Sequence, residues 1–370
     1  MKSLDNPVKP NLVKPGGVIG ILGGGQLGRM LSMAAARLGL KTCVYNDENH
    51  APAFQVTPLQ LAASYTDRAM LQGFAQICDV ITFEFENIPA ESIEYLAGLK
   101  PVRPGLKALA NTQDRFTEKS FVKELGLATA PFFDVTSAED ARKAFAQLGG
   151  PAILKTRRLG YDGKGQAKVA SADAAAKAFE TFKGAPMQGR MPCILEGFVD
   201  FAFEASVVAA RGQDGAFAAY DPPENEHENH ILRRSTVPGR ISKAQSEEAK
   251  AMAQKIAEAL DYVGVLAVEL FVRKDGALLV NEIAPRVHNS GHWTIEACAC
   301  SQFEQHIRAI AGWPLGDPAR HADAVMENII GAEVDAWETM AQSGALHLYG
   351  KRQPRPGRKM GHVTRLKSKT

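Results

Sequence analysis

The sequence predicts a protein of several domains, with an α/β region followed by α+β regions, and three observations support this fold class. The chain of 370 residues is longer than one ordinary hydrophobic core accommodates, so two or three domains are expected. Short apolar runs alternate with helical patterns over residues 17–100, as in a parallel α/β unit. Over residues 131–208, strand patterns surround one alanine-rich helix, which is typical of a compact α+β lobe.

The composition excludes several classes of function. Hydrophobic residues make up 45% of the chain and charged residues 23%, as in soluble globular proteins, and a net charge of +2 gives no basic excess for nucleic acid or a membrane surface. The longest apolar run, "VGVLAV", is too short for a bilayer span, and residues 1–16 lack a signal-peptide core and resemble a flexible arm. Five irregularly spaced cysteines favour neither disulfides nor a zinc site. A cytoplasmic protein without nucleic-acid or membrane partners is expected.

The first predicted unit contains a glycine-rich turn. The runs "GVIGIL", "KTCVYN" and "VITFEF" are predicted strands, and a helix is expected from about Gln26 to Leu38. Between the first strand and this helix, Gly23, Gly25 and Gly28 have G-x-G-x-x-G spacing, and an acidic pair at 47–48 follows about 20 residues on. The pattern makes a dehydrogenase one candidate, but a lone motif is weak evidence and no other dehydrogenase feature appears.

The middle of the chain predicts a linker helix and then the lobe. The string "NTQDRFTEKSFVKELGL" is amphipathic, with Asn111 or Thr112 as the expected N-cap and Gly126 as the expected end. In the lobe, "PAILKT", "AKVA", "PCILEGFV" and "FEASVVAA" are predicted strands, and residues 173–182 form the predicted helix. A long helix follows in "ISKAQSEEAKAMAQKIAEALDY", and the chain after Trp313 is expected to be loop-rich with a basic tail.

One predicted strand ends in Lys155 and leads into a loop that suits phosphate. Glycines allow the backbone to approach phosphate oxygens, and nearby cations supply charge. No G-K-[ST] opens a helix, so this is not a Walker loop, and the strand–loop–strand order resembles the phosphate cover of kinases. An exposed hairpin tip with solvated charges is the alternative. The loop contains three glycines and three cations: Gly160, Gly163, Gly165, Arg157, Arg158 and Lys164.

The string "VGVLAVELFVRKDGALLVNEIAPR" predicts two strands with a tight turn. A two-residue turn at 275–276 pairs Lys274 with Ala277, and the same register places Glu269 opposite Glu282, with Cβ atoms about 5 Å apart. Two carboxylates so placed repel each other unless a cation lies between them, and Mg²⁺ prefers such oxygens together with phosphates. Alternatively both glutamates face solvent, although burying Glu269 unpaired within "VLAVELFV" would be costly.

A dense polar cluster follows directly in "NEIAPRVHNSGHWT". Pro285 and Gly291 indicate a loop, which is where binding residues concentrate. A single histidine would more often be structural, but the whole cluster beside a metal hairpin favours the wall of a substrate site. Its members are Arg286, His288, Asn289, Ser290 and His292.

These features together resemble the ATP-grasp ligases. The strings "GGGQLGRML", "GYDGKGQ", "NEIAPRVHNSGHWT" and "RPGRKMGH", spread over about residues 18–363, are similar to those of the N5-carboxyaminoimidazole ribonucleotide synthetases. In that family the first domain does not bind NAD; its glycine turn faces the ribonucleotide, where a helix N-terminus can hold a phosphate. The resemblance implies an arm at 1–16, a Rossmann-like domain at 17–110, an ATP-grasp domain at 111–312 with its small lobe at about 131–200, and a C-terminal domain at 313–370.

The resemblance also implies an ATP site. Arg115 and Lys155 would contact phosphates, the glycine loop would close over them, the backbone of residues 196–199 would hold adenine, and Glu204 would bind the ribose. Glu269 and Glu282 would bind Mg²⁺. The implied ATP contacts are Arg115, Lys155, Gly160, Tyr161, Asp162, Gly163, Lys164, Gly165, Gln166, Glu196, Gly197, Phe198, Val199, Glu204, His227, Asn281 and Glu282.

A second implied set binds the aminoimidazole ribonucleotide. Lys351 and Arg358 suit its phosphate, since a guanidinium can take two oxygens at once. Without the resemblance, this basic tail would be interpreted as a solvated end. The implied nucleotide contacts are Gln26, Leu27, Glu84, Tyr161, Asp162, Arg286, His288, Asn289, Lys351 and Arg358.

The implied reaction is a carboxylation. Bicarbonate attacks the γ-phosphate of ATP to give carboxyphosphate, whose carboxyl group passes to the exocyclic amine of the nucleotide. Arg286 and Lys155 would stabilise the developing charge, and either Asp162 or His288 would take the amine proton. A homodimer is also implied. One departure is Ala284, which stands where many ATP-grasp enzymes carry a further metal-binding asparagine.

Two other functions remain open at this point. Another ATP-grasp ligase, such as a formate-using glycinamide ribonucleotide transformylase or a biotin carboxylase, would keep the ATP residues and change the acceptor. A non-catalytic ATP-binding subunit would bind ATP without turnover. The nucleotide contacts at His288, Asn289, Lys351 and Arg358 distinguish the first alternative, and the complete set of metal and substrate residues argues against the second.

Overall fold

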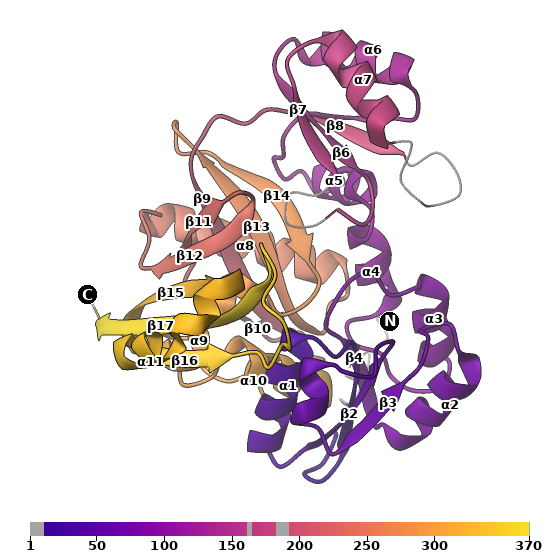
Figure 1. Cartoon of the computed structure of the whole chain (residues 1–370), viewed down its shortest axis with the longest axis vertical. Helices are drawn as coiled ribbons and strands as arrows, with labels where there is room; N and C mark the ends of the chain where they lie inside the picture. The colour runs from indigo at the N-terminus through magenta and orange to yellow at the C-terminus, as the bar shows by residue number, and fades with distance from the viewer. Residues whose placement is uncertain (1–10, 161–164, 183–191, 370) are drawn as a thin grey trace, which may run out of the picture.

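The computed structural model describes residues 11–160, 165–182 and 192–369, which are arranged around three β-sheets. Figure 1 shows a lobe of residues 132–197 at the top, standing apart from the other two sheets. The N-terminal sheet lies below it, beside a larger sheet to which the C-terminal strands belong. No helix in the described ranges is long and apolar enough to cross a membrane.

The N-terminal domain contains four parallel strands in the order β3–β2–β1–β4. The three strands predicted here and the first helix are confirmed. The sequence analysis missed β3, a short edge strand with mostly exposed side chains and no buried apolar run. The elements are β1 (Val18–Leu22), α1 (Gln26–Arg37), β2 (Lys41–Asn46), η1 (Pro52–Gln55), β3 (Leu59–Ala62), α2 (Arg68–Ile77), β4 (Val80–Phe83) and α3 (Ala90–Ala97).

Two helices connect this domain to the upper lobe, α4 (Leu106–Thr112) and α5 (Arg115–Glu124). The predicted N-cap at Asn111 or Thr112 is wrong, because both residues belong to α4. Asp114 caps α5 instead, since its carboxylate accepts the backbone N–H groups of Phe116 and Thr117. Gly126, with φ of 70°, ends the helix as predicted.

The upper lobe is an antiparallel sheet in the order β5–β8–β6–β7, covered by two helices that pack on each other. The prediction of a single helix here is wrong. The second helix, α6, begins at the cap Ser137, whose Oγ accepts the N–H of Asp140 at 3.0 Å, and ends at Gly149. The elements are β5 (Phe132–Val135), α6 (Ala138–Leu148), β6 (Ala152–Thr156), β7 (Gln166–Val169), α7 (Ala172–Phe182) and β8 (Cys193–Gly197).

The large sheet has nine strands in the order β14–β13–β9–β11–β12–β15–β17–β16, with β10 beside β9. Its last strands come from the region expected to be loop-rich, so that expectation is wrong. Basic residues at both ends of β17 obscure its buried centre in the sequence. The elements are β9 (Phe201–Arg211), β10 (Phe217–Ala219), β11 (Glu224–Glu228), β12 (Ile231–Val237), α8 (Lys243–Ala259), β13 (Gly264–Arg273), β14 (Leu278–Ala284), η2 (Asn289–Gly291), α9 (Thr294–Ala297), α10 (Gln302–Ala311), β15 (Ala322–Ile330), η3 (Gly331–Ala336), α11 (Trp337–Ser343), β16 (Ala345–Leu348) and β17 (Lys359–Ser368).

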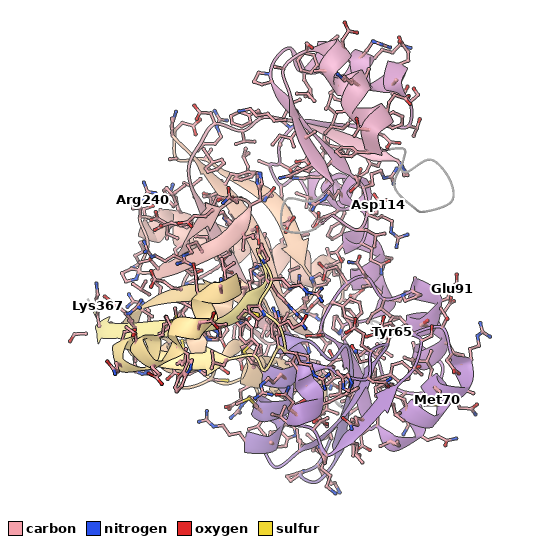
Figure 2. The ribbon with its side chains drawn as sticks, in the orientation of Figure 1. Tyr65, Met70, Glu91, Asp114, Arg240 and Lys367 are labelled. Carbon is pink, nitrogen blue, oxygen red and sulfur yellow. The ribbon has the colours of Figure 1, made fainter. Side chains whose placement is uncertain are left out.

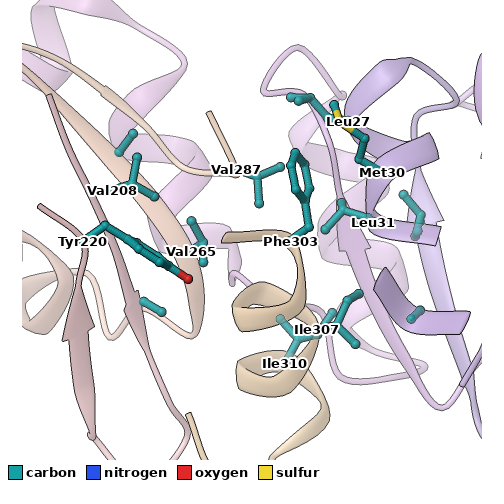
Figure 3. Packing of buried hydrophobic residues seen from close by; sticks show 14 of the residues in the cluster. Leu27, Met30, Leu31, Val208, Tyr220, Val265, Val287, Phe303, Ile307 and Ile310 are labelled. Atoms are coloured by element: carbon teal, nitrogen blue, oxygen red, sulfur yellow. The ribbon is translucent and has the colours of Figure 1, made fainter. Parts of the chain in front are cut away.

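Helix α10 joins the N-terminal domain to the large sheet. Figure 3 shows Phe303 and Ile307 of α10 between Leu31 of α1 on one side and Val208 and Tyr220 on the other. All five side chains are at most 2% exposed, so the interface is a hydrophobic core rather than a hinge surface. On the opposite side of β9 and β13, α8 covers the sheet with a second apolar cluster. Shared burial fixes the first domain relative to the strands that carry the site.

Candidate active site

The β13–β14 hairpin pairs Glu269 with Glu282, as predicted. The predicted two-residue turn is wrong, because Arg273 closes the turn with Ala277, and Gly276 has φ of +87°. A β-bulge at Asn281 then shifts the register by one residue. Such a bulge lets two residues oppose one and re-aims their side chains. The longer turn and the bulge cancel, and the two carboxylates face each other.

Each carboxylate of this pair has a cationic or hydrogen-bonding partner. Arg115 Nη1 lies 2.9 Å from Glu282 Oε2, and His288 Nε2 lies 3.1 Å from Glu269 Oε1. Burial acts to raise the pKa of Glu282, but the charge and hydrogen bond of Arg115, with Lys155 and His288 nearby, hold this pKa at about 2. Glu282 is therefore ionised at neutral pH and able to bind a cation. The described residues contain no group of three or more acidic, histidine or cysteine side chains suited to a metal.

A buried ion cluster lies where the upper lobe meets α5. Lys155 Nζ lies 3.0 Å and Lys119 Nζ 3.7 Å from Glu196 Oε2, and all three side chains are at most 11% exposed. Burial opposes ionisation of Glu196, yet the two lysines, with Arg115, lower its pKa to about 2. Its other oxygen, Oε1, is buried and has no hydrogen-bond partner among the described residues. The sequence analysis identified Lys155 and Glu196 but missed Lys119.

Glu118 is a further buried carboxyl group that the sequence analysis missed. It is one turn of α5 beyond Arg115, and its Oε1 accepts the backbone N–H of Ile283 at 2.5 Å. Burial and the neighbouring charge of Glu282 raise its pKa to about 8. Burial lowers the pKa of Lys119, so Arg115 and Lys155 are the cations of this cluster that suit a phosphate group. Only its spacing from Arg115 on one helix face could have indicated Glu118.

The glycine loop is described only at its two ends. Tyr161, Asp162, Gly163 and Lys164 lie outside the described residues. At the near end, the Gly160 carbonyl accepts from Arg115 Nη2 at 3.4 Å. At the far end, Gln166 pairs with Lys155.

Two of the loop's cations already have protein partners. Arg157 Nε donates to Asp114 at 2.9 Å, at the junction of the lobe and α4 seen in Figure 2, and Arg158 Nη2 donates to Gln113 at 2.7 Å. These two arginines anchor the loop base to the segment between α4 and α5, and Lys155, Lys119 and Arg115 lie beside the carboxylates.

The predicted adenine segment lies at the end of β8 and the predicted ribose residue on β9, the next strand along the chain but in a different sheet. The backbone N–H groups of Gly197 and Phe198 donate to carbonyls of the lobe at 2.8 and 3.0 Å, and Val199 follows directly. Glu204 Oε2 lies 2.7 Å from His227 Nδ1 across β9 and β11. Burial acts to lower the pKa of His227, but the hydrogen bond and charge of Glu204 raise it overall.

The glycine turn of the first domain is filled by a carboxylate of the protein itself. Glu84, at the end of β4, accepts the backbone N–H of Gly25 and, at 2.7 Å, that of Gly28. The expectation that this helix N-terminus offers its N–H groups to a phosphate is therefore wrong for Gly25 and Gly28. Gln26 and Leu27 form the first turn of α1 at the same place. Burial raises the pKa of Glu84, against these hydrogen bonds and the charges of Arg286 and Lys351.

Arg286 is held in a fixed orientation by Glu86, and its charge acts on Glu84. Its Nε and Nη2 atoms lie 2.7 and 3.1 Å from the two carboxylate oxygens of Glu86. This bidentate pair holds the pKa of Glu86 below its usual value although burial opposes ionisation. From the tail, Lys351 Nζ donates to the Lys359 carbonyl at 2.7 Å, and Arg358 Nη1 donates to the Gln353 carbonyl at 3.1 Å. The charge of Lys351 acts to lower the pKa of Glu84. Arg358, in contrast, makes its hydrogen bond to a carbonyl of its own loop.

The polar cluster after the hairpin divides into two groups. His288 faces Glu269, and the amide of Asn289 exchanges hydrogen bonds with Asn328 at 3.0 and 2.7 Å. Ser290 and His292 are completely buried, so the expectation that they contribute to a substrate wall is wrong. Burial, with other histidines nearby, holds the pKa of His292 well below its usual value, as expected for a core residue.

Comparisons with known proteins agree with this geometry. Family models match for the ribonucleotide synthetase preATP-grasp domain over residues 17–113, the ATP-grasp domain over 120–303, and the phosphoribosylaminoimidazole carboxylase C-terminal domain over 324–370. The N5-carboxyaminoimidazole ribonucleotide synthase of Brucella melitensis is 52% identical over 97% of this chain and 98% of its own. That of Bacillus subtilis is 41% identical over 96% and 93%.

Solved structures give the same result. An ADP complex of an N5-carboxyaminoimidazole ribonucleotide synthetase superposes with a TM-score of 0.91 at 41% identity, covering 96% of this chain and 94% of that one. An Aspergillus clavatus N5-carboxyaminoimidazole synthase in complex with ADP and 5-aminoimidazole ribonucleotide gives a TM-score of 0.88 at 32% identity, with 96% and 94% covered. The chain therefore belongs to the N5-carboxyaminoimidazole ribonucleotide synthase family of ATP-grasp ligases.

Proposed function

We propose that this chain carboxylates the exocyclic amine of 5-aminoimidazole ribonucleotide, using ATP and bicarbonate, in purine biosynthesis. The products are N5-carboxyaminoimidazole ribonucleotide, ADP and phosphate. The observation that carries the proposal is the ion cluster around Glu282, in which Arg115, Lys155 and Lys119 converge with the paired hairpin carboxylates. Clusters of buried ionised groups with strongly shifted pKa values are typical of functional sites.

The first step forms an activated carboxylate. A bicarbonate oxygen attacks the γ-phosphorus of ATP, the bond to the bridging oxygen of ADP breaks, and carboxyphosphate forms. Arg115 and Lys155 bind the phosphates and neutralise the charge that develops on them, which is the main contribution a protein makes to phosphoryl transfer. The loop at 160–166 excludes water while the labile intermediate exists.

Magnesium is the proposed metal. The donor set fits this ion, because two carboxylates face each other across the hairpin and Asn281 is the extra residue of the bulge next to Glu282. Glu269 and Glu282 would hold it, and a bound Mg²⁺ supplies charge neutralisation at the phosphates.

The second step transfers the carboxyl group. The carbon–oxygen bond of carboxyphosphate breaks, phosphate leaves, and the carboxyl carbon joins the amine nitrogen, which loses a proton to Asp162 or His288. Arg286, fixed by Glu86, stabilises the carboxylate and phosphate charges. Gln26, Leu27, Glu84, Tyr161, Asn289, Lys351 and Arg358 complete the proposed nucleotide site, with the remaining ATP contacts at Glu196 to Val199, Glu204 and His227.

Nucleotide-dependent ADP release tests this function. Purified protein is incubated with Mg-ATP and bicarbonate, with and without aminoimidazole ribonucleotide, and ADP is measured by a coupled assay. Release that requires both bicarbonate and the nucleotide is expected. Release that requires formate and a different acceptor would identify another ATP-grasp ligase, and ATP binding without release would identify a non-catalytic subunit.

A homodimer and a cytoplasmic location complete the proposal. All five cysteines are free and buried, which suits a reducing compartment. Sedimentation equilibrium at micromolar concentration would test the dimer, since a mass near 39.9 kDa would contradict it. Fractionation of the native cells would test the location.

A further inference from the structure

A chain of buried polar side chains crosses the large sheet and ends at His288. Ser235 lies on β12, Asn225 on β11 and Ser206 on β9, and Ser290 lies in η2 above them. The three serines are completely buried and Asn225 is 5% exposed. Buried polar groups cost free energy unless they are satisfied, so four of them in one row call for a role.

The side chains form a continuous hydrogen-bond chain. Ser235 Oγ donates to Asn225 Oδ1 at 2.7 Å, and Asn225 Nδ2 donates to Ser206 Oγ at 2.9 Å. Ser206 Oγ donates to Ser290 Oγ at 2.7 Å, and Ser290 Oγ lies 2.9 Å from His288 Nδ1. In addition, Ser206 is the register partner of Glu269, so the chain runs beside this carboxylate on the same face of the sheet.

The direction of the hydrogen bond between Ser290 Oγ and His288 Nδ1 follows from a nearby backbone N–H, which can only donate. The backbone N–H of Ser290 also donates to His288 Nδ1, at 3.4 Å. Two donors cannot face each other, so Nδ1 carries no hydrogen and accepts from both the backbone and the hydroxyl of Ser290. The hydrogen of the neutral ring is therefore on Nε2, which points at Glu269 Oε1 at 3.1 Å.

We infer that Asn225, Ser206 and Ser290 are positioning residues that fix His288 as a hydrogen-bond donor to Glu269. The backbone N–H of Ser290 already requires Nδ1 to accept, and the amide of Asn225 adds the hydroxyl of Ser290 as a second donor, because its NH₂ group obliges Ser206 to pass its own hydrogen on to Ser290. Partner groups behind a metal-binding carboxylate orient it in the same way in known metal sites. The catalytic consequence rests on the proposed function: of its two candidates for taking the amine proton, His288 is excluded, since neither ring nitrogen offers it a free lone pair.

Nitrogen NMR of the imidazole rings tests the assignment directly. The full-length protein is labelled with ¹⁵N-histidine, and His288 is identified among the nine histidines by its loss in His288→Gln. At alkaline pH, where imidazoles are neutral, the wild type is expected to show a protonated Nε2 and an unprotonated Nδ1. A protonated Nδ1 would overturn the inference. This measurement needs no turnover, so its result is independent of the proposed function.

Asn225→Asp is the sharpest variant, because a carboxylate accepts from both neighbouring serines and reverses the chain. The Ser290 hydroxyl must then donate to Ser206, so its hydrogen bond to His288 Nδ1 is expected to be lost, and the Nδ1 resonance should move downfield while Nε2 keeps its hydrogen. Ser206→Ala, which interrupts the chain without adding a charge, serves if the first variant does not fold. Thr364→Val is the matched control, since Thr364 has a buried hydroxyl on the same sheet with no hydrogen-bond partner in the described part of the chain.

Kinetics then test the positioning role. In Asn225→Asp and Ser206→Ala, kcat is expected to fall by about 10–100-fold, the range seen when partners behind metal ligands are removed, with little change in KM for ATP. The control should keep wild-type kcat. Unchanged kcat in both variants, or an equal loss in Thr364→Val, would overturn the role. A wild type that is inactive with aminoimidazole ribonucleotide would refute the proposed function and leave the tautomer assignment standing.

Discussion

Two glycine-rich turns of this protein have similar sequences and opposite electrostatics. In the β1–α1 turn, the N–H groups of Gly25 and Gly28 point at the carboxylate of Glu84. Beside the base of the loop after β6, Lys155 of β6 and Arg115 of α5 lie against carboxylates that are paired and ionised. The first turn is closed by an anion of the protein, whereas the base of the second is lined by cations paired with carboxylates, where we propose that the phosphates of ATP bind.

The difference teaches that a glycine in the sequence indicates that another group approaches the backbone closely, but does not indicate which group that is. A Cβ on Gly25 would lie 2.6 Å from Glu84 Oε1, so glycine is needed there to admit an internal side chain. A Cβ on Gly165 would lie 2.6 Å from Thr156 Oγ1, so this glycine serves the packing of the loop base. In both cases the group that requires the glycine is a side chain of the protein. The chemistry of each turn depends on residues distant in sequence.

The largest expected effect concerns the facing carboxylates of the β13–β14 hairpin, which lie beside Arg115. Glu282→Gln removes one of the two facing carboxylates and the partner of Arg115, and kcat should fall by about 10²–10³-fold with the fold intact. Stopped-time ADP assays and circular dichroism measure the two quantities. Turnover close to that of wild type would refute the metal assignment of the hairpin.

Glu196→Gln tests the buried cluster through stability. The change leaves Lys119 and Lys155 without their shared anion and should cost about 3 kcal/mol in the free energy of unfolding at neutral pH. The pKa of Glu196 is lowered to about 2 in the folded protein, so its contribution is present above the unfolded value of about 4.5 and is lost as the pH falls toward 2.

Urea unfolding of both proteins between pH 7 and pH 3 measures this dependence. The wild type and Glu196→Gln should differ most at neutral pH and converge in acid. A difference that stays constant with pH would mean that the loss arises from packing and not from charge.

Arg358→Ala tests the tail contact with the nucleotide phosphate. Removing one charged hydrogen bond costs about 1.4 kcal/mol, so KM for the nucleotide should rise by about tenfold with kcat unchanged. Arg352→Ala is the matched control on the same basic loop. A rise in KM for ATP alone would show that the tail serves a different substrate.

The smallest effect on the use of ATP is expected at the closed turn, whose Glu84 belongs to the proposed nucleotide site. Glu84→Gln removes an acceptor at the N-terminus of α1 and should lower the free energy of unfolding by about 1 kcal/mol. KM for ATP should not change, because ATP contacts are expected only at the other turn. An increase in KM for ATP would break the contrast between the two regions. Fluorescence titration with NADH should detect no binding.

The sequence predicted the elements that carry strong periodicity or caps, including α1, α8 and both strands of the hairpin. The pairing of Glu269 with Glu282 was predicted correctly although the turn was not, because a one-residue error at the turn is cancelled by the bulge at Asn281. Neither feature leaves a signal in a single sequence, since bulges depend on neighbouring strands.

Other parts of the site required the fold. Lys119 and Glu118 are ordinary charged residues in an amphipathic helix, and only their burial against β14 distinguishes them. The filling of the glycine turn by Glu84, which is 56 residues from Gly28 in the chain, likewise depends on the adjacency of β1 and β4.

Isotope transfer from bicarbonate tests the central claim most directly. If a bicarbonate oxygen attacks the γ-phosphorus in the site formed by Lys155, Arg115 and the hairpin glutamates, that oxygen stays on phosphorus when the carboxyl group leaves. With ¹⁸O-labelled bicarbonate, ATP and aminoimidazole ribonucleotide, a single turnover should release phosphate carrying one labelled oxygen, detectable by the isotope shift in ³¹P NMR. Unlabelled phosphate would mean that water attacks ATP, and it would contradict the carboxyphosphate route on which this account of the site depends.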